Sequence, residues 1–427
     1  MINFRFSRRE FLKKSAATTA LFAVARTLLP SGAFAATGPE VNTAKLGFIA
    51  LTDAAPLIVA KEKGIFDKYG MTAVEVLKQA SWGATRDNLV LGSAGSGIDG
   101  AHILTPMPYL MTLGAITQNN MPLPMKILAR LNLDGQGISV AQSYAGLKIG
   151  TDASVLKGVF AKKKADGALA KVAVTFPGGT HDLWMRYWLA AGGIDPNKDV
   201  ETIVVPPPQM VANMKVGTMD AFCVGEPWNA QLVSQGLGYS ALTTGELWTN
   251  HPEKSLALRA DYVDKNPIAT QAILMAVMEA QQWCDADANK DELAQILAKR
   301  EWFNIKPEDI AGRLKGEFDY GNDKIVKSSP HLMKFWRDGA SFPFKSHDAW
   351  FLTENMRWGK VRADTDIGQL IAKVNGSDIW RAAAKTLGVA DIPASDSRGV
   401  EKFFDGKSFD PANPTAYLDS LNIKALA

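Results

Sequence analysis

Short apolar runs alternate with longer segments of helical periodicity in the chain after its N-terminal region. The first series predicts a strand, a helix, a strand, a helix and the beginning of a further strand over residues 44–50, 55–69, 73–78, 82–91 and 97–101. Gly70 is suited to end the first helix, and Ser81 is suited to cap the second. This alternation predicts an α/β fold built on an open, parallel-rich sheet.

A second series of the same kind begins near Leu147. It predicts strands over residues 148–151, 172–174, 200–205 and 221–224, with helices over about 181–191 and 210–216. Two series of similar size predict two lobes with a cleft between them, and 427 residues suffice for both. The remainder from about Asp261 is mostly helical in pattern, including residues 267–285, and we expect it to pack on the first lobe. Lobe 1 is thus expected over residues 36–137 plus about 248–427, with this C-terminal helical elaboration, and lobe 2 over about 138–247.

The first 35 residues have the pattern of an export signal that is removed. Residues 7–13, Ser-Arg-Arg-Glu-Phe-Leu-Lys, match a twin-arginine sequence, and an apolar stretch over 16–29 precedes a signal peptidase pattern, Ala-Phe-Ala, at 33–35. The stretch is too short and too polar to span a membrane. An ordinary amphipathic helix is the alternative. The pattern predicts a twin-arginine (Tat) signal peptide over residues 1–35, the Tat export machinery and signal peptidase as partners, and a soluble periplasmic product.

Charge and cysteine content narrow the classes of function. Removal of residues 1–35 takes away six basic residues and one acidic residue, so the formal net charge falls from +3 to −2. A nearly neutral chain argues against a nucleic-acid or anionic-membrane partner that is recognised through overall charge. Cys223 and Cys284 allow one disulfide, but two buried free thiols are favoured because both cysteines lie among apolar residues.

The sequence lacks the motifs of metal and cofactor enzymes. It has no cysteine cluster for iron and sulfur and no His-x-x-Glu-His helix, and its five histidines are dispersed without ligand spacing. The glycine-rich run at 92–97 lacks the Gly-Lys-Ser/Thr ending of a phosphate loop and predicts a flexible turn instead. A Gly-x-Ser-x-Gly nucleophile elbow is absent. We therefore expect no metal, no cofactor and no catalytic residue, and an exported enzyme is the less favoured alternative.

Two helix starts indicate an anion site. Gly178 and Gly179 precede the helix expected from about His181, and Ser81 and Trp82 open the helix over 82–91. Helix N-termini carry free N–H groups and partial positive charge, and glycines let backbone amides approach a ligand closely. Because one helix belongs to each lobe, an anion held between them would link lobe closure to binding.

Several runs of sequence resemble one family of binding proteins. KQASWGATRDNL at 78–89, GIDGAHILTPMPY at 97–109 and FPGGTHDLW at 176–184 are similar to the nitrate/bicarbonate-binding proteins of cyanobacterial-type ABC importers, and 204–219 and 224–228 continue the match. The resemblance covers nearly all of the predicted mature chain. It implies a type II-like periplasmic binding protein with two α/β lobes, each an open sheet flanked by helices. Such a protein closes on a small oxyanion in the inter-lobe cleft and delivers it to an ABC permease in the inner membrane.

The resemblance also implies the ligand-binding side chains. It places Trp82, Gln136, His181 and Lys254 at the ligand, with Thr180 as a weaker fifth candidate through its hydroxyl or backbone amide. Without it, Gln136 would be part of a lobe-crossing loop and Lys254 a surface lysine. We expect Lys254 to lie at the cleft without supporting core packing.

Lys254 separates two candidate ligands. Nitrate is a planar monoanion without a proton, so its ideal cage contains donors and positive charge but no carboxylate. Bicarbonate has an O–H that needs an acceptor, and bicarbonate-binding relatives carry an acidic residue, together with a cation, where this chain has Lys254. The resemblance therefore implies a nitrate or nitrite binder. Bicarbonate or a small sulfonate such as taurine is the alternative ligand, and a cytoplasmic nitrate-sensing regulator of the same fold is opposed by the export sequence.

Overall fold

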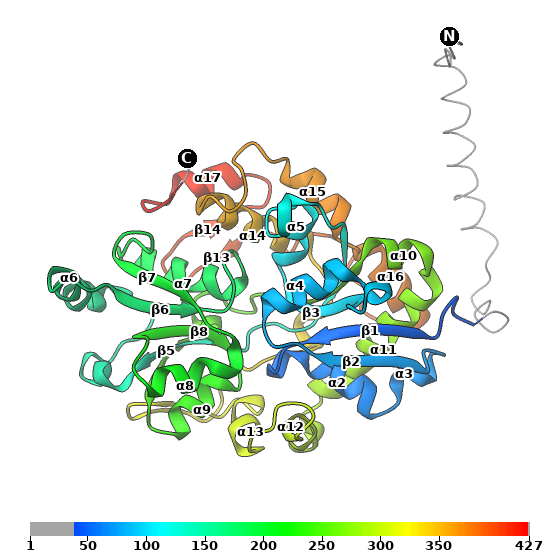
Figure 1. Cartoon of the computed structure of the whole chain (residues 1–427), viewed down its shortest axis with the longest axis horizontal. Coiled ribbons are helices and arrows are strands. Elements are labelled where there is room, and N and C mark those ends of the chain that lie inside the picture. The colour runs from blue at the N-terminus through cyan, green and yellow to red at the C-terminus, as the bar shows by residue number, and fades with distance from the viewer. Residues whose placement is uncertain (1–37, 426–427) are drawn as a thin grey trace, which may run out of the picture.

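The computed structural model describes residues 38–425, which form two lobes side by side (Figure 1). The predicted signal peptide at 1–35 lies outside the described residues. Each lobe contains a five-stranded sheet with helices packed against it. This arrangement confirms the two-lobe α/β binding-protein fold expected from the sequence.

The sheet of lobe 1, on the right in Figure 1, has the strand order β2-β1-β3-β10-β4. Its strands are β1 (Thr43–Phe48), β2 (Ala73–Lys78), β3 (Gly100–Leu104), β4 (Met125–Arg130) and β10 (Lys254–Arg259). β1 runs parallel to β2 and β3, whereas β10 runs antiparallel to β3 and β4. β3 is buried over its whole length, as expected for a strand inside a sheet that helices cover.

The sheet of lobe 2 has the order β7-β6-β8-β5-β9. Its strands are β5 (Gln136–Ala141), β6 (Ala170–Val174), β7 (Val200–Val204), β8 (Ala221–Gly225) and β9 (Gly238–Thr243). β6 is parallel to β7 and β8, and β5 is antiparallel to β8 and β9. Both sheets therefore are mixed, with one antiparallel strand, β10 or β5, in the fourth position, and the other four strands of each sheet share one direction, as expected for a parallel-rich sheet.

The two antiparallel strands are where the chain arrives from the other lobe. It passes from β4 to β5 through residues 131–135 and returns from β9 to β10 through residues 244–253. The two crossing segments contact each other, since the backbone N–H of Asp134 donates to the carbonyl of His251 at 3.0 Å and Leu133 pairs with Pro252. A strand that enters a sheet from the neighbouring lobe is free to run against the local βαβ direction, and a reading of local periodicity cannot detect this.

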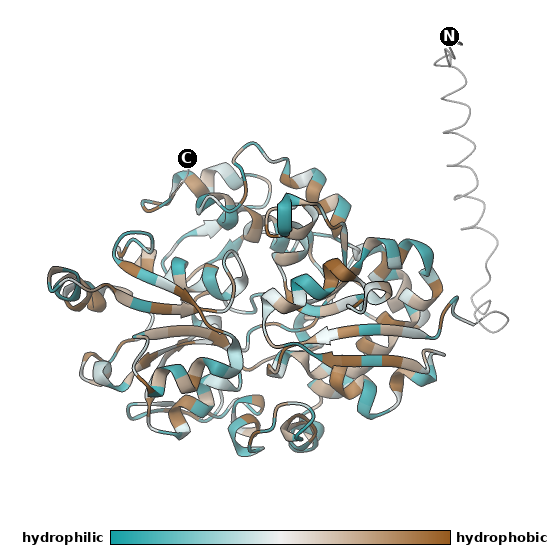
Figure 2. Ribbon diagram, viewed as in Figure 1, coloured by the Kyte–Doolittle hydropathy of each residue, from teal (hydrophilic) through white to brown (hydrophobic). Residues whose placement is uncertain are grey.

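Helices cover the outer faces of both sheets. The α-helices of the described residues up to Asp285 are α2 (Ala55–Glu62), α3 (Ile65–Lys68), α4 (Trp82–Leu91), α5 (Met107–Thr112), α6 (Lys157–Ala165), α7 (Thr180–Ala191), α8 (Met210–Lys215), α9 (Trp228–Ser234), α10 (Ala260–Lys265) and α11 (Pro267–Asp285). The C-terminal part adds the helices α12 (Lys290–Ala298), α13 (Glu308–Leu314), α14 (Lys345–Arg357), α15 (Ile367–Val374), α16 (Ser377–Thr386) and α17 (Pro414–Asp419). It also contains two short two-stranded sheets. One is formed by β11 (Phe318–Gly321) and β12 (Lys324–Val326), and the other by β13 (Glu401–Lys402) and β14 (Ser408–Phe409). Hydrophobic and hydrophilic residues are interspersed along the helices (Figure 2). Within residues 38–425, no helix combines the length and the apolar character needed to cross a membrane.

Several local predictions match the structure and others do not. Helix 82–91 is α4, and the Ser81 hydroxyl caps it by accepting from the N–H of Ala84 at 3.1 Å. The expected helix over 55–69 is instead two helices, α2 and α3, separated by Gly64 in the left-handed region. The strand expected at 148–151 is wrong, because these residues follow a 3-10 segment and pair with no strand. Cys223 and Cys284 are free and buried, which confirms the reading of two separate thiols.

The C-terminal part contacts both lobes rather than lobe 1 alone. α11 packs on α2 in lobe 1, whereas α14 packs on α7 in lobe 2. Trp350 of α14 stacks on Trp184 of α7, with ring centroids 5.0 Å apart and planes at 21°, and Tyr187 donates to Asp405 at 3.0 Å. This packing of the C-terminal part stabilises the position of α7, whose first turn lies where the two lobes meet.

Candidate anion-binding site

Lys254, the first residue of β10, is at the centre of a buried polar cluster between the lobes. Its side chain is 0% exposed. Its ammonium donates to Asp53 Oδ2 at 2.9 Å, to Glu253 Oε1 at 2.9 Å and to Gln136 Oε1 at 3.4 Å. Asp53 lies on the 3-10 turn η2 (Thr52–Ala54), which follows β1 after residues 49–51, and Gln136 begins β5 of lobe 2. The lysine thus bonds to both lobes.

Gln136 and His181 supply the side of this cluster that belongs to lobe 2. The Gln136 amide donates to Asp53 Oδ2 at 3.0 Å, which directs its carbonyl oxygen toward His181 Nε2 at 2.6 Å. Thr175 Oγ1 lies 2.5 Å from His181 Nδ1. Because the amide oxygen can only accept, we assign the imidazole proton to Nε2 and the acceptor role to Nδ1. His181 therefore presents an N–H to the cluster.

Trp82 contributes a donor that no protein atom uses. The residue begins α4 and is fully buried, with its ring centroid 5.9 Å from the Lys254 ammonium and 5.4 Å from the ring of His102. Its indole Nε1 is buried and makes no hydrogen bond to the protein. Buried polar groups without partners are uncommon and costly in native proteins. An indole N–H in this state, beside an ammonium, is suited to donate to an acceptor that comes from outside.

Thr180 is the first residue of α7, and its hydroxyl bonds to Glu253 Oε1. Trp184, one helical turn later, donates its indole N–H to Glu253 Oε2 at 2.8 Å. The structure thus brings all five side chains named from the sequence into one cluster, and Glu253 joins α7 of lobe 2 to the crossing segment. Their contact with a ligand remains a prediction.

Two carboxylates in the cluster overturn the expectation of a cage without them. Asp53 and Glu253 are both buried and both accept from Lys254. Each of their four oxygens accepts at least one hydrogen bond, since His102 Nε2 bonds to Asp53 Oδ1 at 2.6 Å. The same hydrogen bonds engage the donors of Lys254, Gln136 and Thr180, so the donor of the cluster that has no protein acceptor is the Trp82 indole N–H. Asp53 could have been found from its place just after β1, because polar residues at the C-terminal ends of parallel strands often line sites.

The charges of the cluster follow from burial and contact. Burial lowers the pKa of Lys254, but Asp53 and Glu253 outweigh it and leave the pKa above its ordinary value. Burial raises the pKa of Asp53, but Lys254 and His102 outweigh it and hold the pKa well below its usual range. The pKa of His181 falls well below its usual value through burial and through the nearby ammonium. The cluster therefore contains an ammonium, an ionised Asp53 and a neutral His181.

Three of the five dispersed histidines converge here, which the sequence did not predict. His102 bonds to Asp53, His181 bonds to Gln136, and His251 Nδ1 lies 3.8 Å from Glu253 Oε2. Over residues 38–425, no three or more His, Cys, Asp and Glu side chains are grouped so that they could hold a metal ion. His102 and His181 instead bond to Asp53 and to the Gln136 amide, whereas His251 bonds to the Thr244 hydroxyl at 2.7 Å and to the Pro252 carbonyl at 3.1 Å.

The lobes meet directly around the cluster. The backbone N–H of Thr52 in lobe 1 donates to the carbonyl of Glu226 in lobe 2 at 2.8 Å, and the Trp228 indole donates to the carbonyl of Ala50 at 2.9 Å. Gly225, between these contacts, leaves no space for a side chain, because a Cβ there would lie 2.6 Å from Gln136 Oε1. Gly225 is thus a further residue that shapes the site.

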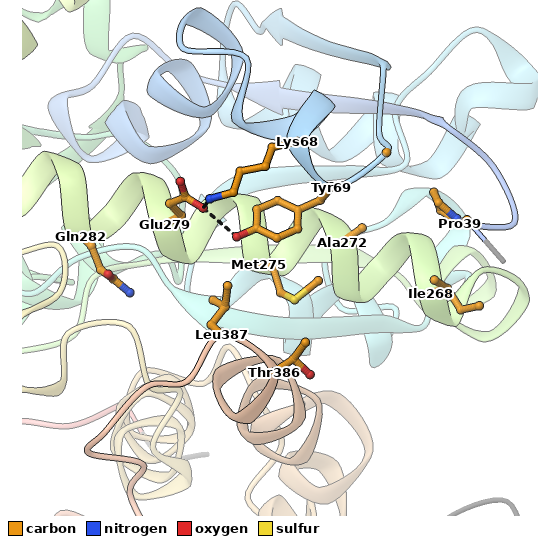
Figure 3. Close-up of a pocket in the computed structure, with 12 residues that line it drawn as sticks. Pro39, Lys68, Tyr69, Ile268, Ala272, Met275, Glu279, Gln282, Thr386 and Leu387 are labelled. Atoms are coloured by element: carbon orange, nitrogen blue, oxygen red, sulfur yellow. Dashed lines mark hydrogen bonds and ion pairs between the residues drawn. The ribbon is translucent and has the colours of Figure 1, made fainter. Parts of the chain in front are cut away.

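A hollow with a volume of about 770 Å³ lies away from this cluster, on the outer face of lobe 1 between α3, α11 and the end of α16 (Figure 3). Its polar lining is Lys68, Tyr69 and Glu279, which bond to one another, with apolar Ala272 and Met275 beside them. It shares no residue with the Lys254 cluster and contains no unpaired charge among these three groups.

Comparisons with known proteins agree with this geometry. The model of the NMT1-like family matches residues 37–298. The chain is 64% identical over 391 residues, 91% of its length and 86% of the relative's, to the nitrate/nitrite binding protein NrtA of Synechocystis sp.. The crystal structure of the periplasmic nitrate-binding protein NrtA from Synechocystis superposes with a TM-score of 0.88 at 63% identity, covering 91% of this chain and 100% of that one.

Two further relatives carry other names. The bicarbonate-binding protein CmpA of Synechococcus elongatus is 46% identical over 90% of this chain and 88% of its own length. The nitrate import ATP-binding protein NrtC of Synechocystis sp. is 34% identical over 90% of this chain, which corresponds to 56% of that protein. With a matching family model over more than half of its length and these identities, the chain belongs to the NMT1-like family and, within it, to the nitrate- and bicarbonate-binding proteins of ABC importers.

Proposed function

We propose that this protein captures nitrate, and also nitrite, in the periplasm and delivers it to an ABC importer. The observation that carries the proposal is the buried indole N–H of Trp82, which has no protein partner and lies beside the Lys254 ammonium. Nitrate offers three acceptor oxygens and no proton, so it can accept directly from the Trp82 indole, and from Lys254, Gln136, His181 and Thr180 where it replaces the protein acceptors that these donors now use. Micromolar affinity requires about 8 kcal/mol, and several charge-assisted hydrogen bonds are enough to supply it.

The carboxylate oxygens near Lys254 favour nitrate over bicarbonate, because they already accept hydrogen bonds from the protein. The O–H of bicarbonate needs an acceptor, whereas every carboxylate oxygen near Lys254 already accepts from a protein donor. The higher identity to proteins named for nitrate and nitrite than to those named for bicarbonate points the same way.

Calorimetric titration of the protein lacking residues 1–35 tests the proposal. Nitrate and nitrite are expected to bind with one site, and both should raise the melting temperature without being consumed. Bicarbonate, sulfate and taurine are the comparison ligands. Tighter binding of bicarbonate or taurine than of nitrate would refute the ligand assignment, and turnover of any of them would refute a role confined to binding.

Trp82→Phe separates the ligand role of the indole from its packing role. Loss of one hydrogen bond to a charged ligand costs about 1.5–3 kcal/mol, so nitrate affinity should fall about 10- to 100-fold by calorimetry. Trp188→Phe is the matched control, because its indole donates to the carbonyls of Gly150 and Thr151 and lies outside the cluster. The control should lose stability and keep nitrate affinity. Equal nitrate affinity in Trp82→Phe and the parent would show that the indole does not contact the ligand.

The route of export is part of the same proposal. The twin-arginine pair is read by a receptor rather than acting as general charge, so replacing Arg8 and Arg9 by lysines should leave unprocessed precursor in the cytoplasm. Cell fractionation and immunoblotting measure this, with Arg26→Lys as the control for a loss of guanidinium elsewhere in the segment. Normal processing and export of the double variant would contradict the Tat assignment.

A further inference from the structure

With an anion bound, the negative charges around Lys254 would outnumber the single positive charge of its ammonium. Lys254 and Asp53 neutralise each other, and Glu253 is a second carboxylate on the same ammonium. Burial raises the pKa of Glu253, and Lys254, Thr180 and Trp184 offset this only in part. With Glu253 ionised, nitrate would bring the buried cluster to a net charge of −2. Uncompensated charge in the interior is strongly unfavourable, so a proton or a cation must accompany the anion.

The groups that face Glu253 leave few places for that proton. They are Lys254, Thr180, His181 and Trp184 on α7, His251 on the crossing segment and Cys223 on β8, and Asp53 on η2 shares the Lys254 ammonium with Glu253. Asp53 is held ionised by Lys254 and His102. His181 Nε2 lies 3.5 Å from the Lys254 ammonium, so an imidazolium there would face a second positive charge. Burial lowers the pKa of His251 to about 3 and keeps the Cys223 thiol protonated by raising its pKa.

We propose, resting on the proposed nitrate function, that Glu253 takes up one proton from solvent as nitrate enters, so that the protein captures the anion together with a proton. The proton forms an O–H bond at Glu253 Oε1, the oxygen that already lies against the Thr180 hydroxyl and the Lys254 ammonium. Glu253 then donates to Thr180 Oγ1, and the Thr180 hydroxyl turns to donate to a nitrate oxygen. A hydroxyl can make this exchange because it both accepts and donates. The ammonium, released from one of its two ionised partners, is freer to bond to nitrate.

The sign of the pH dependence follows from linkage. Nitrate raises the affinity of Glu253 for a proton, so the proton raises the affinity for nitrate equally. Between the pKa of Glu253 in the free protein and its higher pKa in the complex, nitrate affinity should weaken about tenfold per pH unit as the pH rises. Below that window Glu253 is already protonated, and affinity should not depend on pH.

Proton uptake is measured by titrating nitrate into the protein in buffers of different ionisation enthalpy, at several pH values between about 5 and about 9. The parent should take up close to one proton per nitrate within part of this range. Glu253→Gln should bind nitrate with uptake close to zero. Glu279→Gln is the matched control, because Glu279 also bonds a lysine ammonium, Lys68 at 2.6 Å, but on the outer face of lobe 1, and it should retain the parent's uptake.

A second measurement uses the parent protein alone, should Glu253→Gln not fold. Difference infrared spectroscopy should show the carbonyl band of a protonated carboxylic acid appearing when nitrate is added. Nitrate binding without proton uptake at any pH in the range, or uptake without this band, would overturn the role of Glu253 and leave the nitrate function standing. Absence of nitrate binding in the parent would refute the proposed function itself.

Discussion

Lys254→Glu is expected to abolish nitrate binding. One charge at about 4 Å from a monoanion contributes on the order of 4 kcal/mol at an effective dielectric constant of about 20, and the substitution reverses its sign. The new carboxylate would also join Asp53 and Glu253, which lie 2.9 Å from the present ammonium. Calorimetry on variant protein shown to be folded by circular dichroism should detect no nitrate binding. Lys254→Ala should lose less, about 2–4 kcal/mol, because the helix N-termini of α4 and α7 remain.

The same substitution should weaken the fold, contrary to the expectation of a cleft lysine that supports no packing. Lys254 is fully buried and pairs with two carboxylates, and loss of one partner of a buried pair costs about 3–5 kcal/mol. Lys215→Glu, an identical change at an exposed position of α8, is the control and should alter neither stability nor affinity. If folded Lys254→Glu bound nitrate as tightly as the parent, Lys254 would not contact the ligand and the ligand assignment would lose its main support.

Asp53→Asn should be the most destabilising single-atom change in the cluster. Asp53 accepts from Lys254, Gln136 and His102, and His102 Nδ1 lies 3.5 Å from the N–H of Ile49, which fixes the imidazole proton on Nε2. An asparagine amide facing Nε2–H would oppose two donors, and an oxygen there would leave the amide against Lys254. We expect a loss on the order of 3 kcal/mol in the free energy of unfolding, measured with urea at neutral pH.

The pH dependence of the stability lost in Asp53→Asn tests whether the charge of Asp53 is its cause. Asp53 has a pKa below its unfolded value, so its stabilisation is present above about pH 4 and disappears as the pH falls toward the folded pKa. The gap in stability between parent and Asp53→Asn should therefore narrow in acid. Asp166→Asn, in an exposed pair with Lys162, should change stability by less than about 0.5 kcal/mol. A gap that stayed constant from pH 7 to about pH 3 would show that the charge of Asp53 is not what stabilises the cluster.

Local patterns predicted the elements that depend on a single segment. β2 and α11 have the bounds expected from periodicity, and Ser81 caps α4 as its residue type indicated. The family resemblance named five side chains that the fold brings into one cluster. It could not show that Lys254 is buried, because burial depends on what packs around a residue rather than on the residue itself.

The strands that define the topology were the least visible in the sequence. β5 begins at Gln136, which without the family resemblance would be part of a crossing loop, and β10 begins at Lys254, which without it would be a surface lysine. Neither follows a helix of its own lobe, so the strand–helix–strand rule gave no expectation for them. Their antiparallel direction is set by where the chain re-enters each sheet.

The sequence by itself determined the helices and most strands of the two βαβ series, the two-lobe α/β class and the residues shared with the family, because hydrophobic periodicity and motifs are local properties of the chain. Only the tertiary structure decided that Asp53 meets Lys254, 201 residues later, that Glu253 joins the first turn of α7, and that Trp82 keeps a donor without a partner. Charge balance inside a protein depends on such distant contacts, since burial makes each unpaired charge costly and only the fold determines which charges are buried together.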